Sequence, residues 1–268
     1  MKKFLEFLMS LFSNKKKKIS ALPLPKDQSE IFLNKTLGLW MHTALSQLVN
    51  DSVFFEMIRV KKRENTNVWW MYFFNENDYG RIAVSFYTGK FGASPVNPDV
   101  VKWMRGRMET SIKNGFAVVA WLTADDSPSV NRSSAVEKCT HARNVVQLFG
   151  DLISGYCVGL ELEETTPVSH AAAVVAELRA HTNKSIGVHE VTGQTAYAKI
   201  GGVDTMYYQY GFNKSVSQIA SETHSAKARV PGIVFIAAEY HLDSTSLDAK
   251  GLGQAALTAG AQGTGCGR

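Results

Sequence analysis

Cysteine is scarce in this sequence, and long apolar runs are absent from it. Three cysteines occur among 268 residues, Cys139, Cys157 and Cys266, and their spacing is not that of a metal site. An odd, widely separated set argues against a disulfide framework and favours a reducing compartment or buried thiols. No run reaches the roughly 20 apolar residues of a membrane-spanning helix. The 45% hydrophobic content suffices for the core of one large α/β domain.

A net excess of positive charge is missing from most of the chain, although the whole sequence carries a net charge of +5. Residues 1–18 contain six of the 29 basic residues and one of the 24 acidic residues, so the remainder is neutral. Phosphate binding needs basic side chains gathered on the folded surface. A nucleic-acid partner is therefore not expected.

The basic N-terminal segment, residues 1–18, has lysines on both sides of a short apolar stretch. On a helix its apolar side chains share one side, which favours contact with a membrane surface or a protein partner. A basic tail with no specific partner is the alternative. Glu6 interrupts the apolar stretch and lysines follow it, so no secretory signal is expected. We expect a cytoplasmic protein or one peripheral to a membrane.

Residues 19–35 contain two prolines and read as a linker, and one domain is expected over residues 36–268. In this domain, short apolar runs alternate with amphipathic stretches, the pattern of repeated β/α units. The expected strands are 37–43, 68–75, 116–124, 156–163, 185–190, 205–211, 232–239 and 261–265. The expected helices are 46–63, 97–114, 132–153, 168–182, 214–229 and 246–259, with a short one within 192–202.

Eight right-handed β/α crossovers close into a (β/α)8 barrel, the TIM-barrel fold. The sequence stops directly after the eighth strand, so we expect this barrel to lack its eighth helix. Residues 80–89 form an extra strand-like run, interpreted as an inserted hairpin or loop wall. An open, doubly wound α/β sheet is the alternative fold.

Glutamates close two of the apolar strands. Glu161 and Glu163 lie at the end of GYCVGLELEE (155–164), and Glu239 closes the run in GIVFIAAEYH (232–241). A buried, unpaired carboxylate is costly, and active sites of β/α barrels form at the carboxyl ends of the strands. Alternation along a strand predicts that all three side chains point into the barrel mouth. Two neighbouring carboxylates also raise one pKa, which suits a general acid.

Such a site is suited to glycoside cleavage, in which one carboxyl group protonates the leaving oxygen and a second attacks or activates water. Aromatic rings at the mouth would offer sugars a flat apolar surface. The expected substrate-binding residues are Trp40, Trp70, Trp121, His189, Tyr210 and His241. No tight His/Asp spacing indicates a metal, so neither a metal nor another cofactor is expected.

GLELE (Gly159–Glu163) together with Met206-Tyr207-Tyr208 resembles the strand-four and strand-six motifs of chitinase-type family 18 barrel glycoside hydrolases. This resemblance implies that Glu163 is the proton donor and that Glu161 tunes its pKa. It also implies that Tyr208 orients an N-acetyl group of the substrate.

The placement of Glu163 and Glu239 is similar to that in retaining barrel glycosidases, whose acid/base lies on strand four and nucleophile on strand seven. The two resemblances together imply a hydrolase of an amino-sugar polymer such as chitin or peptidoglycan.

Two other functions stay open. Glycines in AGAQGTGCGR (259–268) could approach a phosphate, as in a lyase, isomerase or flavin barrel. The second open function is that of a non-catalytic barrel, tethered by its N-terminus, that binds glycan or protein. It stays open because a fold does not by itself specify a function.

Overall fold

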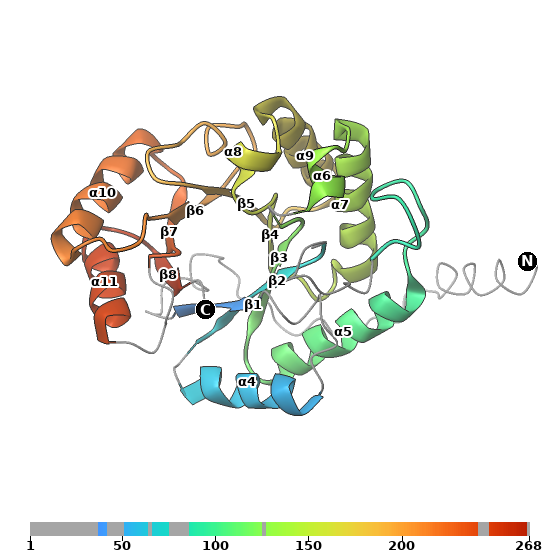
Figure 1. Cartoon of the computed structure of the whole chain (residues 1–268), viewed down its shortest axis with the longest axis horizontal. Helices are drawn as coiled ribbons and strands as arrows, with labels where there is room; N and C mark the ends of the chain where they lie inside the picture. The colour runs from blue at the N-terminus through green and yellow to red at the C-terminus, as the bar shows by residue number, and fades with distance from the viewer. Residues whose placement is uncertain are drawn as a thin grey trace, which may run out of the picture.

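The computed structural model describes residues 37–41, 51–63, 66–74, 86–124, 127–240 and 247–266. Eight parallel strands form a closed barrel in chain order, with β8 paired to β1 (Figure 1). The strands are β1 Leu37–Met41, β2 Val68–Tyr72, β3 Ala117–Trp121, β4 Gly155–Cys157, β5 Ser185–Glu190, β6 Thr205–Gln209, β7 Val234–Ala238 and β8 Gly263–Cys266. The barrel expected from the sequence is confirmed, and the open doubly wound sheet is excluded.

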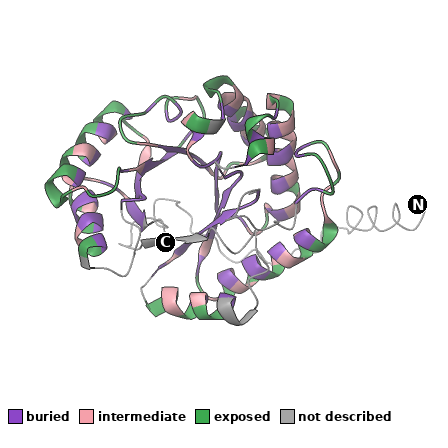
Figure 2. Ribbon diagram, in the orientation of Figure 1, coloured by how far each residue is buried: buried purple, intermediate pink, exposed green. Residues whose placement is uncertain are grey.

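Helices surround the barrel, and their inner faces are buried against it while their outer faces are exposed (Figures 1 and 2). The long helices are α4 Asp51–Arg63, α5 Pro98–Lys113, α7 Ala135–Phe149, α9 Val168–His181, α10 Val216–Arg229 and α11 Leu247–Thr258. Two one-turn helices, α6 Pro128–Asn131 and α8 Leu162–Thr165, precede α7 and α9. Residues 191–204 contain only turns, so the expected short helix there is wrong.

Local capping signals explain where helices begin. The Asn97 side chain accepts the Asp99 N–H at 3.1 Å, and Pro98 occupies the first turn of α5. Ser134 and Glu137 form a reciprocal capping box at the start of α7. Short polar side chains thus satisfy backbone donors that a helix start leaves unpaired.

Several sequence predictions lie outside the described residues. The basic N-terminal segment and the linker belong to residues 1–36, so contact of the segment with a membrane or a partner stays a prediction. Residues 80–85 are also undescribed, and within the rest of the expected insertion Tyr87 forms an antiparallel bridge with Val96. Among the described helices, none is long and apolar enough to cross a membrane.

Aromatic side chains fill the interior of the barrel. The rings of Trp70, Trp121 and Tyr207 lie within 5.2–5.4 Å of one another. Glycines on the same inner face make room for them: a Cβ at Gly187 would lie 2.5 Å from Cε2 of Tyr207, and a Cβ at Gly265 would overlap the Trp70 ring. Large and small residues therefore alternate around the barrel, as close packing requires.

Candidate functional site

Strand four ends earlier than the sequence predicts. β4 stops at Cys157, and the Leu160 N–H donates to the Thr123 carbonyl at 3.0 Å as the chain turns toward α8. A Cβ at Gly159 would lie 2.6 Å from Oγ1 of Thr123, so a larger residue there would require the Thr123 side chain to move. The strand alternation expected for Glu161 and Glu163 is therefore wrong, because neither residue is on the strand.

Glu161 lies at the inner edge of this turn. Its backbone N–H donates to Nδ1 of His189 at 3.0 Å, and His189 is a fully buried residue at the end of β5. The imidazole packs 5.1 Å from the Trp121 ring, which belongs to the aromatic interior. Glu161 itself is half-buried and has a left-handed backbone, with φ 39°. The turn thus places Glu161 directly above the inner residues of β3 and β5.

Glu163 is on α8 and faces the connection that follows β5. Its Oε1 accepts the Val191 N–H at 3.1 Å, and its Oε2 is buried with no hydrogen-bond partner among the described residues. Burial raises the pKa of Glu163, and the Glu164 charge adds to this shift. The sequence predicted a raised pKa, but its main cause is burial rather than repulsion from Glu161.

Glu190 is a buried carboxyl group that the sequence prediction missed. It follows His189 on β5, is fully buried, and accepts the Tyr197 N–H at 2.5 Å. Burial raises the pKa of Glu190 to about 7; the Glu163 charge also raises it, whereas hydrogen bonds from the backbone and the Lys199 charge act in the opposite direction. The sequence signal, a glutamate closing an apolar strand, was the same one that drew attention to Glu239.

Glu190→Gln is expected to remove a pH-dependent loss of stability. The pKa of Glu190 is 4.5 in its ordinary state and about 7 in the folded protein, so unfolding becomes easier as pH rises through this window. The shift corresponds to about 3 kcal/mol in the free energy of unfolding at high pH. Glutamine still accepts the Tyr197 N–H but does not ionise.

Denaturant unfolding at a series of pH values measures this difference. The stability of the Glu190→Gln variant relative to the wild type should increase by about 3 kcal/mol between about pH 4 and pH 8. Glu109→Gln, which removes an exposed carboxyl group on α5, controls for the loss of one charge. Parallel pH curves for wild type and Glu190→Gln would contradict the prediction.

Glu239 directly follows β7. Its N–H donates to the Gly265 carbonyl of β8 at 3.0 Å, the residue is 8% exposed, and its φ is 47°. The glutamates after β4 and β7 therefore share a left-handed backbone, which costs a non-glycine residue about 1–2 kcal/mol. Such strain is concentrated at functional sites.

Tyr208 and Tyr210 contact α10 instead of the barrel interior, so the structure gives no support to the site roles predicted for them. Both are fully buried, Tyr208 within β6 and Tyr210 just after that strand. The Tyr208 hydroxyl donates to Oε1 of Glu222 at 2.9 Å, and the Tyr210 hydroxyl lies 2.7 Å from Oγ1 of Thr223. The intervening residue, Tyr207, is the one that enters the barrel.

Two of the aromatic residues predicted to bind sugar at the mouth of the barrel are buried in its interior instead. Trp70 and Trp121 are 1% and 0% exposed and belong to the packed interior, so they do not form an open sugar platform. His189 lies beneath Glu161 and is equally buried. The Trp40 side chain and His241 lie outside the described residues, although the backbone register pairs Trp40 with Trp70.

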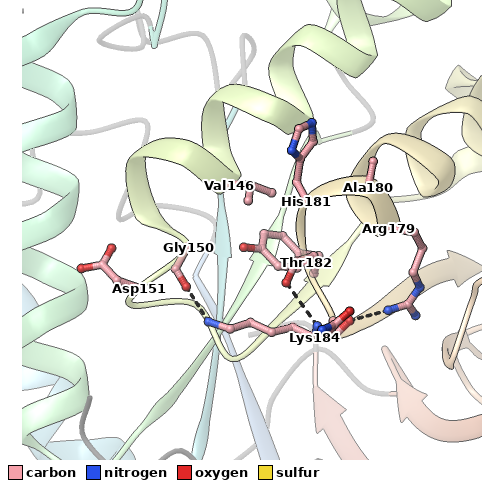
Figure 3. A pocket seen from close by; sticks show the side chains of 10 residues that line it. Val146, Gly150, Asp151, Arg179, Ala180, His181, Thr182 and Lys184 are labelled. Atoms are coloured by element: carbon pink, nitrogen blue, oxygen red, sulfur yellow. Dashed lines mark hydrogen bonds between the residues drawn. The ribbon is translucent and has the colours of Figure 1, made fainter. Parts of the chain in front are cut away.

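Within the described ranges, no group of three or more His, Cys, Asp or Glu residues is arranged to hold a metal ion. A groove of about 710 Å³ lies at the opposite end of the barrel, where α7 and α9 end and β5 begins (Figure 3). Lys184 spans it and donates to the carbonyls of Gly150 and Ile153. The side chains there hold loops together at the amino-terminal face, which in β/α barrels serves stability.

No protein-family model and no curated protein sequence matches the chain. Its fold is similar to that of a glycoside hydrolase family 5 structure from Bacteroides vulgatus, with TM-score 0.67, 13% identity, and coverage of 87% of this chain and 57% of that one. An exo-β-1,4-mannosidase from an Opitutaceae bacterium gives TM-score 0.64, 12% identity, and coverage of 87% and 52%.

A family 1 β-glucosidase from Thermotoga maritima gives TM-score 0.59, 11% identity, and coverage of 80% and 76%. The chain spans about half the length of the family 5 structure and the mannosidase. At these identities the likeness concerns the fold alone. The chain is thus a (β/α)8 barrel that shares its fold with glycoside hydrolases.

Proposed function

We propose that the protein is a glycosidase that hydrolyses a polysaccharide at the carboxyl end of its barrel, with Glu161 and Glu239 as the two catalytic carboxyl groups. The observation that carries this proposal is the shared left-handed backbone of the glutamates that follow β4 and β7. One would protonate the leaving oxygen, and the other would attack the anomeric carbon or activate water. Strand four and strand seven are also where retaining barrel glycosidases carry their acid/base and nucleophile.

Glu161 replaces Glu163 as our preferred general acid. The Glu161 backbone is bonded to an inward-facing residue of β5, whereas Oε1 of Glu163 is bonded to the backbone of the β5–β6 connection. The raised pKa of Glu163 has a structural explanation in its burial near Glu190. A raised pKa alone does not identify a catalytic acid, since buried structural carboxyls shift similarly.

Two substrate classes are to be tested, one from the predicted role of Tyr208 and one from the structural comparison. Tyr208 is bonded to α10, so substrate-assisted attack by an N-acetyl group has no support from this residue. Chitin and peptidoglycan therefore form one arm of the substrate test. Neutral β-linked polymers form the other, because a structurally similar protein is an exo-β-1,4-mannosidase.

A phosphate site after β8 is less well supported than a glycan site. Gly263 and Gly265 lie within β8, and the position of Gly265 is explained by contact with the Trp70 ring. A non-catalytic glycan-binding protein has the same fold, but glycan binding does not require the carboxylates to react. Amide variants separate the two, since glutamine retains hydrogen bonding but neither donates an acidic proton nor attacks.

Reducing-sugar release from peptidoglycan, chitin, β-mannan and β-glucan tests the function. Glu161→Gln should lower hydrolysis by about 10²-fold or more, while Glu163→Gln, its matched control two residues away, should retain it within roughly tenfold. The reverse ranking would return the acid role to Glu163. Polymer that is bound but not cleaved by the wild type would contradict the enzyme and favour the binding barrel.

A further inference from the structure

A buried imidazole supports the backbone of the glutamate assigned as general acid. His189 is fully buried at the carboxyl end of β5, and its Nδ1 lies 3.0 Å from the backbone nitrogen of Glu161. Its ring is held in turn by Trp121, 5.1 Å away between ring centroids. A continuous set of contacts therefore leads from the rigid aromatic interior to Glu161.

The direction of this hydrogen bond defines the tautomer of His189. A backbone N–H can only donate, so Nδ1 is the acceptor and the proton of the neutral ring lies on Nε2. Burial lowers the pKa of His189 to about 3. Nδ1 thus stays available as an acceptor throughout the neutral and mildly acidic range.

Glu161 needs support because its backbone is strained. Its φ of 39° and ψ of 58° are left-handed, a conformation that a residue with a Cβ adopts only when its surroundings impose it. Its carbonyl accepts the Glu164 N–H at 3.0 Å, and the preceding Leu160 N–H donates to Thr123. The bond to His189 adds a side-chain acceptor to this framework.

We propose that His189 is a positioning residue for the reaction: through Nδ1 it holds the left-handed backbone of Glu161 and so aims the catalytic carboxyl group. This inference rests on the proposed function. It differs from the substrate-binding role that the sequence indicated, since a fully buried ring beneath Glu161 acts through that residue. Displacing a catalytic group by about 1 Å can cost on the order of 10²-fold in rate.

Two substitutions separate the acceptor from the ring. His189→Asn keeps an acceptor, Oδ1, at the position of Nδ1 but removes the ring, whereas His189→Phe keeps a ring but removes the acceptor. If positioning is the role, His189→Phe should lower kcat by about 10²-fold with little change in KM, because the acid acts in the transition state. His189→Asn should retain kcat within roughly tenfold despite lower thermal stability.

A second buried histidine supplies the matched control. His141 is 1% exposed on α7 and is hydrogen-bonded to the Tyr87 hydroxyl and the Leu122 carbonyl, at 2.9 and 2.8 Å. His141→Phe should lower the thermal midpoint without lowering kcat. Nitrogen-15 NMR of the wild type should show Nδ1 of His189 unprotonated and Nε2 protonated, unchanged between about pH 5 and pH 8.

The outcomes of this experiment are distinct. A His189→Phe variant as active as the wild type, or a His189→Asn variant that is the less active of the two, would overturn the positioning role while leaving the glycosidase intact. Protonation of Nδ1 in the NMR spectrum would do the same. A wild-type protein that cleaves no polymer would overturn the proposed function and, with it, this role.

Discussion

Glu239→Ala is expected to lower kcat by about 10³-fold or more while leaving polysaccharide binding nearly unchanged. Glu239 follows β7 and is only 8% exposed, so the residue as a whole is buried at the carboxyl end of the barrel. Its N–H is bonded to β8 through the Gly265 carbonyl, and alanine preserves that backbone bond. The substitution therefore removes the reacting group more than the local structure. Steady-state kinetics with a retention assay on the cleaved polymer measure both effects.

Glu239→Gly is the matched variant for stability. Both substitutions remove the carboxyl group, but glycine adopts φ 47° without strain, whereas alanine does not. The glycine variant should thus be about 1 kcal/mol more stable than the alanine variant and equally inactive. Equal stability of the two would contradict the strain at this position, and wild-type kcat in either would contradict the catalytic role.

The configuration of the freshly released sugar distinguishes the two chemical roles of Glu239. If Glu239 is the nucleophile, the wild type keeps the anomeric configuration of the substrate; if Glu239 is the base that activates water, the configuration is inverted, and proton NMR during cleavage reads the difference. In either case azide can enter the space left in Glu239→Ala and attack the anomeric carbon of an aryl glycoside, expelling the phenolate and forming a glycosyl azide. Recovery of this product would show that Glu239 acts on the face of the sugar opposite the leaving group.

Gly265→Ala is expected to destabilise the barrel by about 3 kcal/mol. The added Cβ would overlap Cη2 of Trp70 and lie 2.7–2.8 Å from Cζ3 and Cζ2 of the same ring. Trp70 is 1% exposed and packs against Trp121 and Tyr207, so the ring has no open space to enter. Either β8 or the aromatic interior must shift, and calorimetry or denaturant unfolding would record the loss.

Gly106→Ala is the control for the conformational effect of replacing glycine. Gly106 lies in α5, and a Cβ there would meet nothing within 4 Å. Alanine should stabilise this helix by up to about 1 kcal/mol. Opposite signs for the two substitutions would confirm that steric overlap, and not the loss of glycine itself, causes the effect at position 265. A stabilising Gly265→Ala would contradict the packing of Trp70 against β8.

The sequence by itself determined the number, order and approximate position of the strands. A parallel strand of a β/α barrel is covered on both faces, so it appears as a short continuous apolar run between amphipathic helices. VWWMY in β2 and VFIAA in β7 are clear examples. Helix starts could also be predicted from neighbouring residues, because the capping box of Ser134 and Glu137 depends on residues three positions apart.

Only the tertiary structure decided which face of each strand enters the barrel. Tyr207 and Tyr208 are both buried aromatic residues, and sequence alternation cannot distinguish the inner layer from the helix-facing layer when both are apolar. The structure puts Tyr207 against Trp121 and Tyr208 against Glu222 of α10. The orientation of Tyr208 could not be predicted from the sequence for this reason.

The same limit applied to the glutamates. GLELE has the alternation of a strand, but β4 ends at Cys157, and the chain then turns toward α8 with the Leu160 N–H bonded to the Thr123 carbonyl. That turn brings Glu161 to His189 and directs Glu163 to Val191, on elements 28 residues away in each case. Residue type and spacing located the carboxyl groups at one end of the barrel, whereas their separation into two environments required the long-range contacts of a closed sheet.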